Sequence, residues 1–409
     1  MHPIMTQAFR RMARFPLTAA ALALLTLPQL AHAAPAPEVD HQATRKICQV
    51  TGEVDRSTGR ATVNRTESRY RFWGTDLGAS FEHDGKLVVL FGDTHPMPGL
   101  ERLPDRDLLA ISADTNPEDC LHVDVLTDGD GGYRPLAIPG VDGGEFSVPT
   151  GGFSAGGAMH VVATTGKSAT SPMARSILAK SVDGGRTFQP EYELSSRHFI
   201  NVAAAHAEPA DASGLPAGAG DGILLWGSGA YRKSDAYLAV LPADRVGDRS
   251  AMRFFAGTDE AGQPRWSARE EDSRPLFQQS CIGELSVAWN ADLGKWVMMY
   301  NCGEPRSRIL VRTADRPWGP WSSPQVLFDA AADKGFCRFM NNPGEAGCPA
   351  VSDPHNPETA GDPYAPYMIA RFSRGEPGRY SDVYFLMSTW NPYNVVLMSA
   401  RLKVPEPNA

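Results

Sequence analysis

The sequence predicts an all-β protein, and the repetition of its strands indicates a five-bladed β-propeller. Helical periodicity is scarce along the 409 residues. Short β-branched or aromatic runs bounded by Gly, Asp, Asn and Pro recur instead, as at 87–91, 159–164 and 296–300. These runs form about five groups with hairpin signals, which favours radial repetition. The groups lie near residues 73–115, 145–190, 198–245, 278–330 and 362–402.

The N-terminus has the pattern of a secretory signal peptide. Three arginines, Arg10, Arg11 and Arg14, precede an apolar run at 15–30, and the small-residue stretch Ala31-His32-Ala33 follows it. We predict a signal peptide at residues 1–33, and hence a secreted or periplasmic protein. The apolar run is too short for a comfortable membrane span and no later run is as long, so we expect no membrane span in the mature chain.

The remaining 376 residues (409 minus 33) carry a strongly negative formal charge. The charge of −8 becomes −11 without the three signal-peptide arginines, because that segment holds no Asp or Glu. A nucleic-acid or anionic-membrane partner is disfavoured, since such polymers would be repelled. We predict a lead-in and first edge strand at 34–69 and one catalytic propeller domain at 70–405, acting as a monomer.

Six cysteines in an exported chain predict disulfides, although six allow 15 connectivities. Proximity in the sequence favours Cys337–Cys348. Cys281 and Cys302 stand on the two arms of a predicted hairpin, which favours a second pair, and elimination leaves Cys48–Cys120. No pair has the C-x-x-C spacing of zinc or redox sites, so we assign no metal ligands and predict no cofactor.

Two aspartates flank the strongest hairpin signal of the chain. If Asp84 and Gly85 form the turn, facing residues have numbers that sum to 169, which sets Asp76 opposite Asp93. When two carboxyl groups lie that near to each other, the pKa of one of them rises, and the pair becomes competent for acid–base catalysis. Glycosidases need such a pair, so we predict that both are catalytic. The alternative is that each aspartate only caps a turn beside a glycine.

Two further acidic residues are candidates for substrate binding. Glu284 alternates away from the apolar face of its strand, and it either faces a central cleft or lies on a solvated surface. Asp235 opens a strand much as Asp76 does, but a salt bridge to Arg232 or Lys233 is the alternative.

The remaining substrate-binding candidates are polar or aromatic. His95 follows the second aspartate closely and could bind a sugar hydroxyl, or be an ordinary rim residue. Sugar rings stack on aromatic side chains, and Trp73, Tyr231 and Trp390 suit that role. Ser147 could belong to a polar floor, although a glycine-rich β-bend explains it equally well.

Other motifs narrow the function. Residues 181–188 fit the S-x-D-x-G-x-T-F pattern of the Asp-box, a structural hairpin turn of sialidase-like propellers, so Asp183 is not a site candidate. The chain lacks a P-loop, a strand-linked G-x-G-x-x-G, an H-E-x-x-H and a G-x-S-x-G elbow. Nucleotide-binding, zinc-protease and serine-hydrolase functions therefore lose their strongest support.

Several segments together resemble one known family over residues 70–402. They are Gly74-Thr75-Asp76-Leu77-Gly78, Leu90-Phe91-Gly92-Asp93-Thr94, Gly283-Glu284-Leu285-Ser286 and the run 388–398. The family was long catalogued only as a domain of unknown function and is now associated with endo-D-arabinanases acting on mycobacterial-type arabinogalactan and lipoarabinomannan. The resemblance implies a five-bladed propeller with its active site at one end of the central channel, and essential aspartates at positions 76 and 93.

Three hypotheses follow. The first is an exported glycoside hydrolase that cleaves α-D-arabinofuranosyl linkages of a polysaccharide, with Asp76 and Asp93 as its acid–base pair. The second is a glycan-binding propeller without catalysis. The third is a sialidase-like glycosidase, which would need an arginine cluster for the substrate carboxylate; Arg232, Arg308 and Arg371 are the candidates.

Overall fold

A computed structural model describes residues 35–98, 106–129, 131–142, 144–169, 171–345, 348, 351–353 and 356–406. The predicted signal peptide at 1–33 lies outside these residues. The segment Ala36–Ala409 forms one compact unit. Within the described ranges, none of the helices has the length and apolar character that a membrane span requires.

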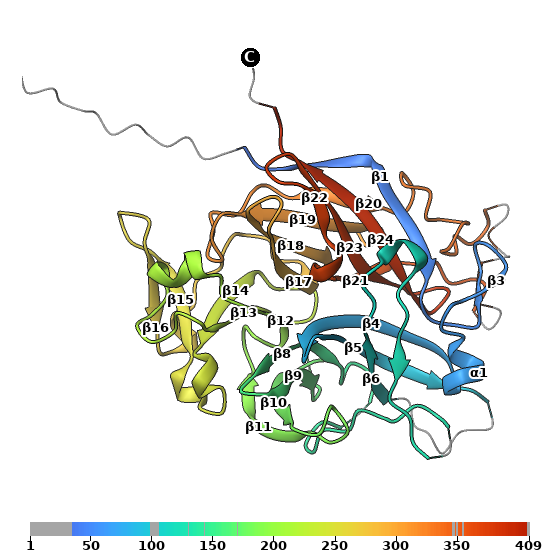
Figure 1. Cartoon of the computed structure of the whole chain (residues 1–409), viewed down its shortest axis with the longest axis horizontal. Coiled ribbons are helices and arrows are strands. Elements are labelled where there is room, and N and C mark those ends of the chain that lie inside the picture. Colours follow the sequence, from blue (N-terminus) through green and yellow to red (C-terminus); the bar gives the residue numbers. More distant parts are fainter. Residues whose placement is uncertain are drawn as a thin grey trace, which may run out of the picture. The chain divides into compact units, whose positions relative to one another are not determined.

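The unit is a five-bladed β-propeller, as predicted. Each blade is an antiparallel sheet of four or five strands, and the blades follow one another in chain order around a ring (Figure 1). The first blade consists of β4 (Phe72–His83), β5 (Lys86–Pro96), β6 (Arg106–Ser112) and β7 (Asp124–Val125). The second consists of β8 (Pro149–Ala155), β9 (Ala158–Thr165), β10 (Arg175–Ser181) and β11 (Gln189–Ser195).

The other three blades repeat this arrangement. The third has β12 (Asn201–His206), β13 (Ile223–Ser228), β14 (Ala236–Leu241), β15 (Arg253–Thr258) and β16 (Pro264–Ser267). The fourth has β17 (Ile282–Asn290), β18 (Lys295–Cys302), β19 (Arg308–Ala314) and β20 (Gln325–Asp329). The fifth has β21 (Pro363–Met368), β22 (Arg374–Glu376), β23 (Tyr380–Thr389), β24 (Asn394–Lys403) and β1 (Glu38–Gln49).

Short elements lie between the strands, both within and between blades. A small hairpin of β2 (Val54–Asp55) and β3 (Arg60–Ala61) precedes helix α1 (Thr66–Tyr70). The 3-10 turns described are Pro117–Asp119, Pro209–Gly214, Ala243–Arg245, Arg249–Ala251, Glu270–Asp272 and Ala370–Phe372.

The ring closes in two ways. The innermost strands β4, β8, β12, β17 and β21 each contact the next, and β21 contacts β4. In addition, β1 pairs with β24, so the start of the domain supplies the outer strand of the last blade (Figure 1). This pairing ties the two ends of the domain into one sheet.

Apolar side chains fill the space between neighbouring blades. Trp226 of β13 and Trp296 of β18 are fully buried with ring centroids 5.1 Å apart, which joins the third blade to the fourth. Trp289 packs partly buried against the same cluster. The Asp-box turn also forms as predicted, because Asp183 accepts a hydrogen bond from the backbone of Thr187 at 3.0 Å.

The β4–β5 hairpin corrects the predicted register of the two aspartates. Asp84 and Gly85 form the turn with positive φ values of 48° and 75°, and residues 79–83 pair as predicted. A bulge then shifts the register at Leu77 and Gly78, so Asp76 faces Gly92 instead of Asp93. Asp93 lies in a second irregularity with a φ of 42°.

All three predicted disulfides are confirmed: Cys48–Cys120, Cys281–Cys302 and Cys337–Cys348. Disulfides persist in oxidising compartments, which fits an exported protein. Cys48–Cys120 links β1, in the fifth blade, to a loop of the first blade across the ring closure.

Replacing both Cys48 and Cys120 by alanine should lower the free energy of unfolding by about 2–5 kcal/mol. The bridge spans 72 residues, so its removal frees a long loop in the unfolded chain and loosens the ring closure. Urea unfolding measures the loss. The Cys337/Cys348 double alanine variant is the comparison, because it opens a loop of only 11 residues and should lose less; an equal or larger loss there would contradict the prediction.

Candidate active site

A cavity of about 500 Å³ lies where the innermost strands begin. Every blade contributes to it at least one residue from the N-terminal half of its inner strand, and these include Asp76, Thr150, Asn201, Glu284 and Tyr364. Loops between strands complete the wall with Glu145, Phe146, Val148, Met173, Tyr231, Arg232, Arg306, Asp353, Asn356, Thr359, Asp362, Trp390, Asn391 and Tyr393. The volume is within the usual range for small-molecule sites.

Backbone strain concentrates around this cavity. Leu77, Asp93, Phe146 and Arg232 all line it and have positive φ values of 64°, 42°, 65° and 53°. Ala365, directly after Tyr364, has a φ of 52°. Such conformations cost free energy in residues with a side chain and cluster at functional sites. The strain therefore supports the cavity as the functional site.

Asp76 is buried at the floor of the cavity. Its Oδ2 accepts a hydrogen bond of 2.8 Å from the Tyr364 hydroxyl. Its Oδ1 is buried and accepts no hydrogen bond of normal geometry from the described residues. Burial raises the pKa of Asp76 well above its usual range, and the negative charge of Asp93 raises it further; the hydroxyls of Tyr364 and Tyr393 lower it without reversing the shift.

Asp93 is half-buried and faces the same cavity from β5. Its backbone N–H donates to the Asp107 carboxylate at 3.2 Å, and its own Oδ2 accepts a 3.5 Å hydrogen bond from the backbone of Phe146. The two aspartates therefore interact across the cavity although they are not paired across the hairpin.

The surroundings of Glu284 shift its pKa in the direction opposite to that of Asp76. It is 4% exposed, and Arg232 donates to both of its oxygens at 3.0 and 3.2 Å. Asn301 donates a further hydrogen bond at 2.8 Å. Burial alone would raise the pKa of Glu284, but the Arg232 guanidinium and these hydrogen bonds outweigh it and lower the pKa. Glu284 is therefore a fixed negative charge and not a proton donor.

Aromatic side chains form one rim of the cavity. The rings of Trp73 and His95 stack with centroids 4.9 Å apart, and Tyr393 contacts both. Trp390 extends the group beside Tyr393 and is 53% exposed. Exposed aromatic faces next to buried carboxyl groups are suited to binding sugar rings.

The structure places most of the predicted site residues together. Trp73, Asp76, Asp93, His95, Tyr231, Glu284 and Trp390 all line the cavity. Ser147 does not, because its hydroxyl is turned to Asp142 and Thr165. Asp235 does not either, because it accepts hydrogen bonds from the backbone of Gln279 and the hydroxyl of Ser280. Arg232, which we considered as a salt-bridge partner of Asp235, pairs with Glu284 instead.

Several lining residues were missed by the sequence analysis. Tyr364, which holds Asp76, and Asn201 give no motif, although both stand at the start of an inner strand as Glu284 does. The wall residues Asp353, Asn356, Thr359 and Asp362 were missed as well. The backbone around them is held by two buried amides, since Asn341 donates to the carbonyl groups of Pro357 and Thr359, and Asn391 donates to those of Asn356 and Thr359.

The cavity is acidic. Six carboxyl groups line it against two guanidinium groups; the acids are Asp76, Asp93, Glu145, Glu284, Asp353 and Asp362, and the bases are Arg232 and Arg306. Arg306 lies 3.7 Å from Asp362. Arg308 and Arg371 do not line the cavity and pair with Asp329 and Glu82. The arginine cluster that a sialidase needs does not form, and an anionic ligand would be repelled.

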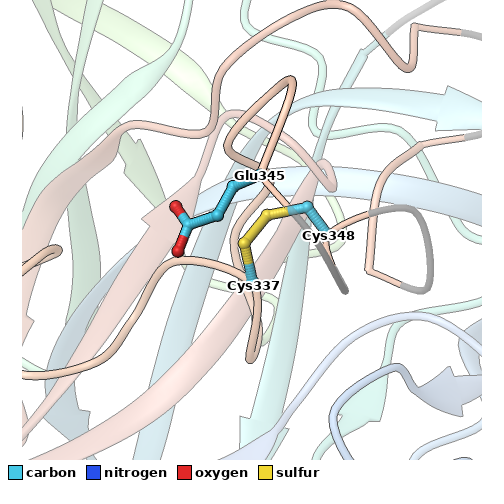
Figure 2. A group of neighbouring side chains, drawn as sticks. All are labelled: Cys337, Glu345 and Cys348. Carbon is cyan, nitrogen blue, oxygen red and sulfur yellow. A yellow bond between two sulfur atoms is a disulfide. The ribbon is translucent and has the colours of Figure 1, made fainter.

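Among the residues that the structure describes, two groups of potential metal ligands lie outside the cavity. Figure 2 shows Cys337, Glu345 and Cys348, in which the two sulfur atoms are bonded to each other and are not available as thiolates. In the second, Asp114 accepts hydrogen bonds from the backbone and the ring of His122. We assign no metal site to either group.

Three solved structures match this chain at low sequence identity. A presumed hydrolase from Bacteroides ovatus ATCC 8483 matches with a TM-score of 0.52 and 12% identity, over 82% of this chain and 87% of its own. A GH43_1 enzyme from Xanthomonas citri gives a TM-score of 0.43 and 13% identity over 80% and 87%, respectively. An exo-1,5-α-L-arabinanase from a bovine ruminal metagenomic library gives 0.43 and 9% over 81% and 94%. The first of these three supports the fold.

The family comparison covers most of the propeller. No curated protein matches the sequence. The model of the family described as "Domain of unknown function (DUF4185)" matches residues 61–399, from β3 to β24. The chain therefore belongs to the DUF4185 family.

Proposed function

We propose that this protein is an exported glycoside hydrolase that cleaves α-D-arabinofuranosyl linkages within a D-arabinan. The observation that carries the proposal is the protonatable carboxyl group of Asp76, buried beside Asp93 in a strained, acidic cavity with an aromatic rim. A buried carboxyl group that keeps its proton, with a second carboxyl group in the same cavity, is the equipment of glycoside hydrolysis.

Asp76 acts as the general acid. Burial keeps its carboxyl group protonated at a pH where an ordinary aspartate is ionised, so it can donate a proton to the leaving glycosidic oxygen. Asp93, which is half-buried, acts either as the base that activates water or as the nucleophile. The anomeric configuration of the first product distinguishes these two roles, since a nucleophile retains it and a base inverts it.

Glu284 and its partner Arg232 shape the field around Asp76. The ionised Glu284 contributes to the raised pKa of Asp76, and its carboxylate also favours the positive charge that develops on the sugar ring in the transition state. Trp73, His95, Tyr231 and Trp390 would stack against or bind the sugar units.

The choice of a neutral polysaccharide follows from the acidic lining, and the choice of arabinan follows from the family resemblance of the motifs around Asp76 and Asp93. The test is to incubate the mature protein with purified arabinogalactan, with lipoarabinomannan and with unrelated neutral glycans, and to analyse the released oligosaccharides. We expect arabinose oligomers from the first two. Binding to arabinan without release of oligomers would support a glycan-binding propeller instead, and release only from another glycan would overturn the substrate class.

Tyr364→Phe should move the alkaline limb of the pH–rate profile to higher pH. The Tyr364 hydroxyl stabilises the ionised form of Asp76 by a hydrogen bond and so lowers its pKa. Without it the acid stays protonated to higher pH, and kcat/KM persists further into the alkaline range. The measurement is kcat/KM against pH. Tyr192→Phe is the control, because Tyr192 donates to the Val246 carbonyl away from the cavity; a limb that stays in place or moves to lower pH in Tyr364→Phe would contradict the assignment of the acid.

A further inference from the structure

Asn201 is a buried amide without a partner. It is the first residue of β12, it is 2% exposed, and it lines the cavity. Neither its Oδ1 nor its Nδ2 has a hydrogen-bond partner among the described residues. A buried polar group left unpaired costs about 1–3 kcal/mol, so such a group needs an explanation.

Two other buried asparagines of the same fold are satisfied on both sides. Asn301 donates to Glu284 and accepts from the backbone of Ala365. Asn290, as buried as Asn201, donates to the Ser381 hydroxyl and accepts from the backbone of Leu293. Asn201 differs from these two asparagines because it lines the cavity, where a ligand can reach its amide.

The chemistry of an amide limits what can satisfy it. Its NH₂ group donates and its oxygen accepts, so a bare cation would satisfy only the oxygen and an anion only the NH₂ group. The six carboxyl groups of the lining further disfavour an anion. Two adjacent hydroxyl groups of a sugar satisfy both atoms, since each hydroxyl can donate and accept.

The position of Asn201 also fits a ligand that spans the cavity. It begins the inner strand of the third blade, whereas Asp76 lies on the inner strand of the first, with β8 of the second blade between them. A sugar unit bound to Asn201 would therefore be held from a different side of the propeller than the acid, Asp76.

We propose that the Asn201 amide binds two neighbouring ring hydroxyls of the sugar unit presented to Asp76 and so determines which sugar is accepted. This proposal rests on the proposed glycoside hydrolase function and assigns its specificity. The substrate hydroxyls would supply the hydrogen-bond partners that none of the described residues provides.

The test compares Asn201→Ala with Asn290→Ala. In Asn201→Ala, kcat/KM on an arabinofuranosyl oligomer should fall about 10- to 100-fold, since two hydrogen bonds are lost, while the melting temperature stays unchanged or rises. Asn290→Ala should show the reverse, with a lower melting temperature and unchanged kcat/KM, because its amide is satisfied within the fold and lies outside the cavity.

A substrate series gives a second readout. Oligomers that lack one ring hydroxyl on the unit at the cleaved bond should lose kcat/KM with the wild-type protein. The two oligomers that lack a hydroxyl bound by the amide should lose less than the parent oligomer when Asn201 is replaced by alanine. Asn201→Asp should recover at most part of the activity, because it keeps an acceptor but loses the donor.

Each of the following three outcomes would contradict the proposal, and each would identify a different error. Wild-type cleavage with unaltered kcat/KM in Asn201→Ala removes the role of Asn201 and leaves the glycoside hydrolase intact. A melting temperature lowered in Asn201→Ala as much as in Asn290→Ala assigns the amide to folding. A wild-type protein that neither cleaves nor binds any neutral glycan overturns the proposed function and this inference together.

Discussion

Asp76→Asn is expected to lower kcat by about 10²–10⁴-fold without lowering the stability of the fold. General acid catalysis contributes a factor of that size, and asparagine cannot donate the proton. The amide has nearly the same shape as the carboxyl group and can still accept the hydrogen bond from Tyr364. The measurements are steady-state kinetics on arabinan oligomers and urea unfolding of the same preparations.

The pH dependence of stability should change in a defined direction. The raised pKa of Asp76 means that the folded protein holds a proton that the unfolded chain releases above about pH 4. The wild-type protein therefore loses stability at this site as pH rises from that value to the pKa of the folded state, and Asp76→Asn removes the loss. The free energy of unfolding of the variant, compared with that of the wild type, should therefore increase as pH rises from acidic to neutral.

Asp211→Asn is the matched control. Asp211 is also a buried aspartate whose pKa is raised by burial, but it accepts a hydrogen bond from Trp296 Nε1 and pairs with Arg316, outside the cavity. The Asp211→Asn protein should keep the activity of the wild type, while its free energy of unfolding falls. An Asp76→Asn protein that retains wild-type kcat would leave the proposed mechanism without its acid.

Arg232→Met is expected to lower the free energy of unfolding by about 3–5 kcal/mol at neutral pH. The change leaves the Glu284 carboxylate buried without its cation, and breaking a buried ion pair from one side has a cost of this order. In the wild type, the lowered pKa of Glu284 means that its stabilising contribution is present above about pH 4.3 and is lost as pH falls. The variant should therefore show its largest deficit at neutral pH and a smaller one in acid.

The double variant Arg232→Met/Glu284→Gln separates charge from packing. Without either charge the desolvation penalty disappears, so the double variant should recover much of the stability that Arg232→Met loses. Unfolding in urea at neutral and acidic pH measures both effects. A loss below about 1 kcal/mol in Arg232→Met would mean that the pair behaves as a solvated surface pair.

Local patterns in the sequence predicted the blades but not the detailed register of the site. Turn chemistry at Asp84 and Gly85 fixed the first hairpin, and strand grouping gave the five blades. The bulge at Leu77 and Gly78 could not be foreseen, because it depends on a distant contact. A side chain at Gly78 would lie within 2.7 Å of Leu386 in the fifth blade.

The site residues that could not be predicted from the sequence escaped prediction for one physical reason. Tyr364 and Asn201 matter because the ring brings the starts of the inner strands together, and no local pattern records that meeting. Aligning the first residues of each strand group would have pointed to Asn201, Glu284 and Tyr364 as a set. Ser147 and Asp235 stood near strand starts too, but local hydrogen bonds turn them away from the cavity.

The protonation state of Asp76 at a pH above the ordinary aspartate pKa of about 4 is the most direct test of these ideas. Infrared difference spectra between the wild-type protein and Asp76→Asn report it, because a protonated carboxyl group and a carboxylate absorb at different frequencies. We expect a protonated carboxyl band in the wild type that is absent from the variant and persists in Asp211→Asn. A carboxylate band in its place would show that Asp76 is already ionised and cannot be the proton donor.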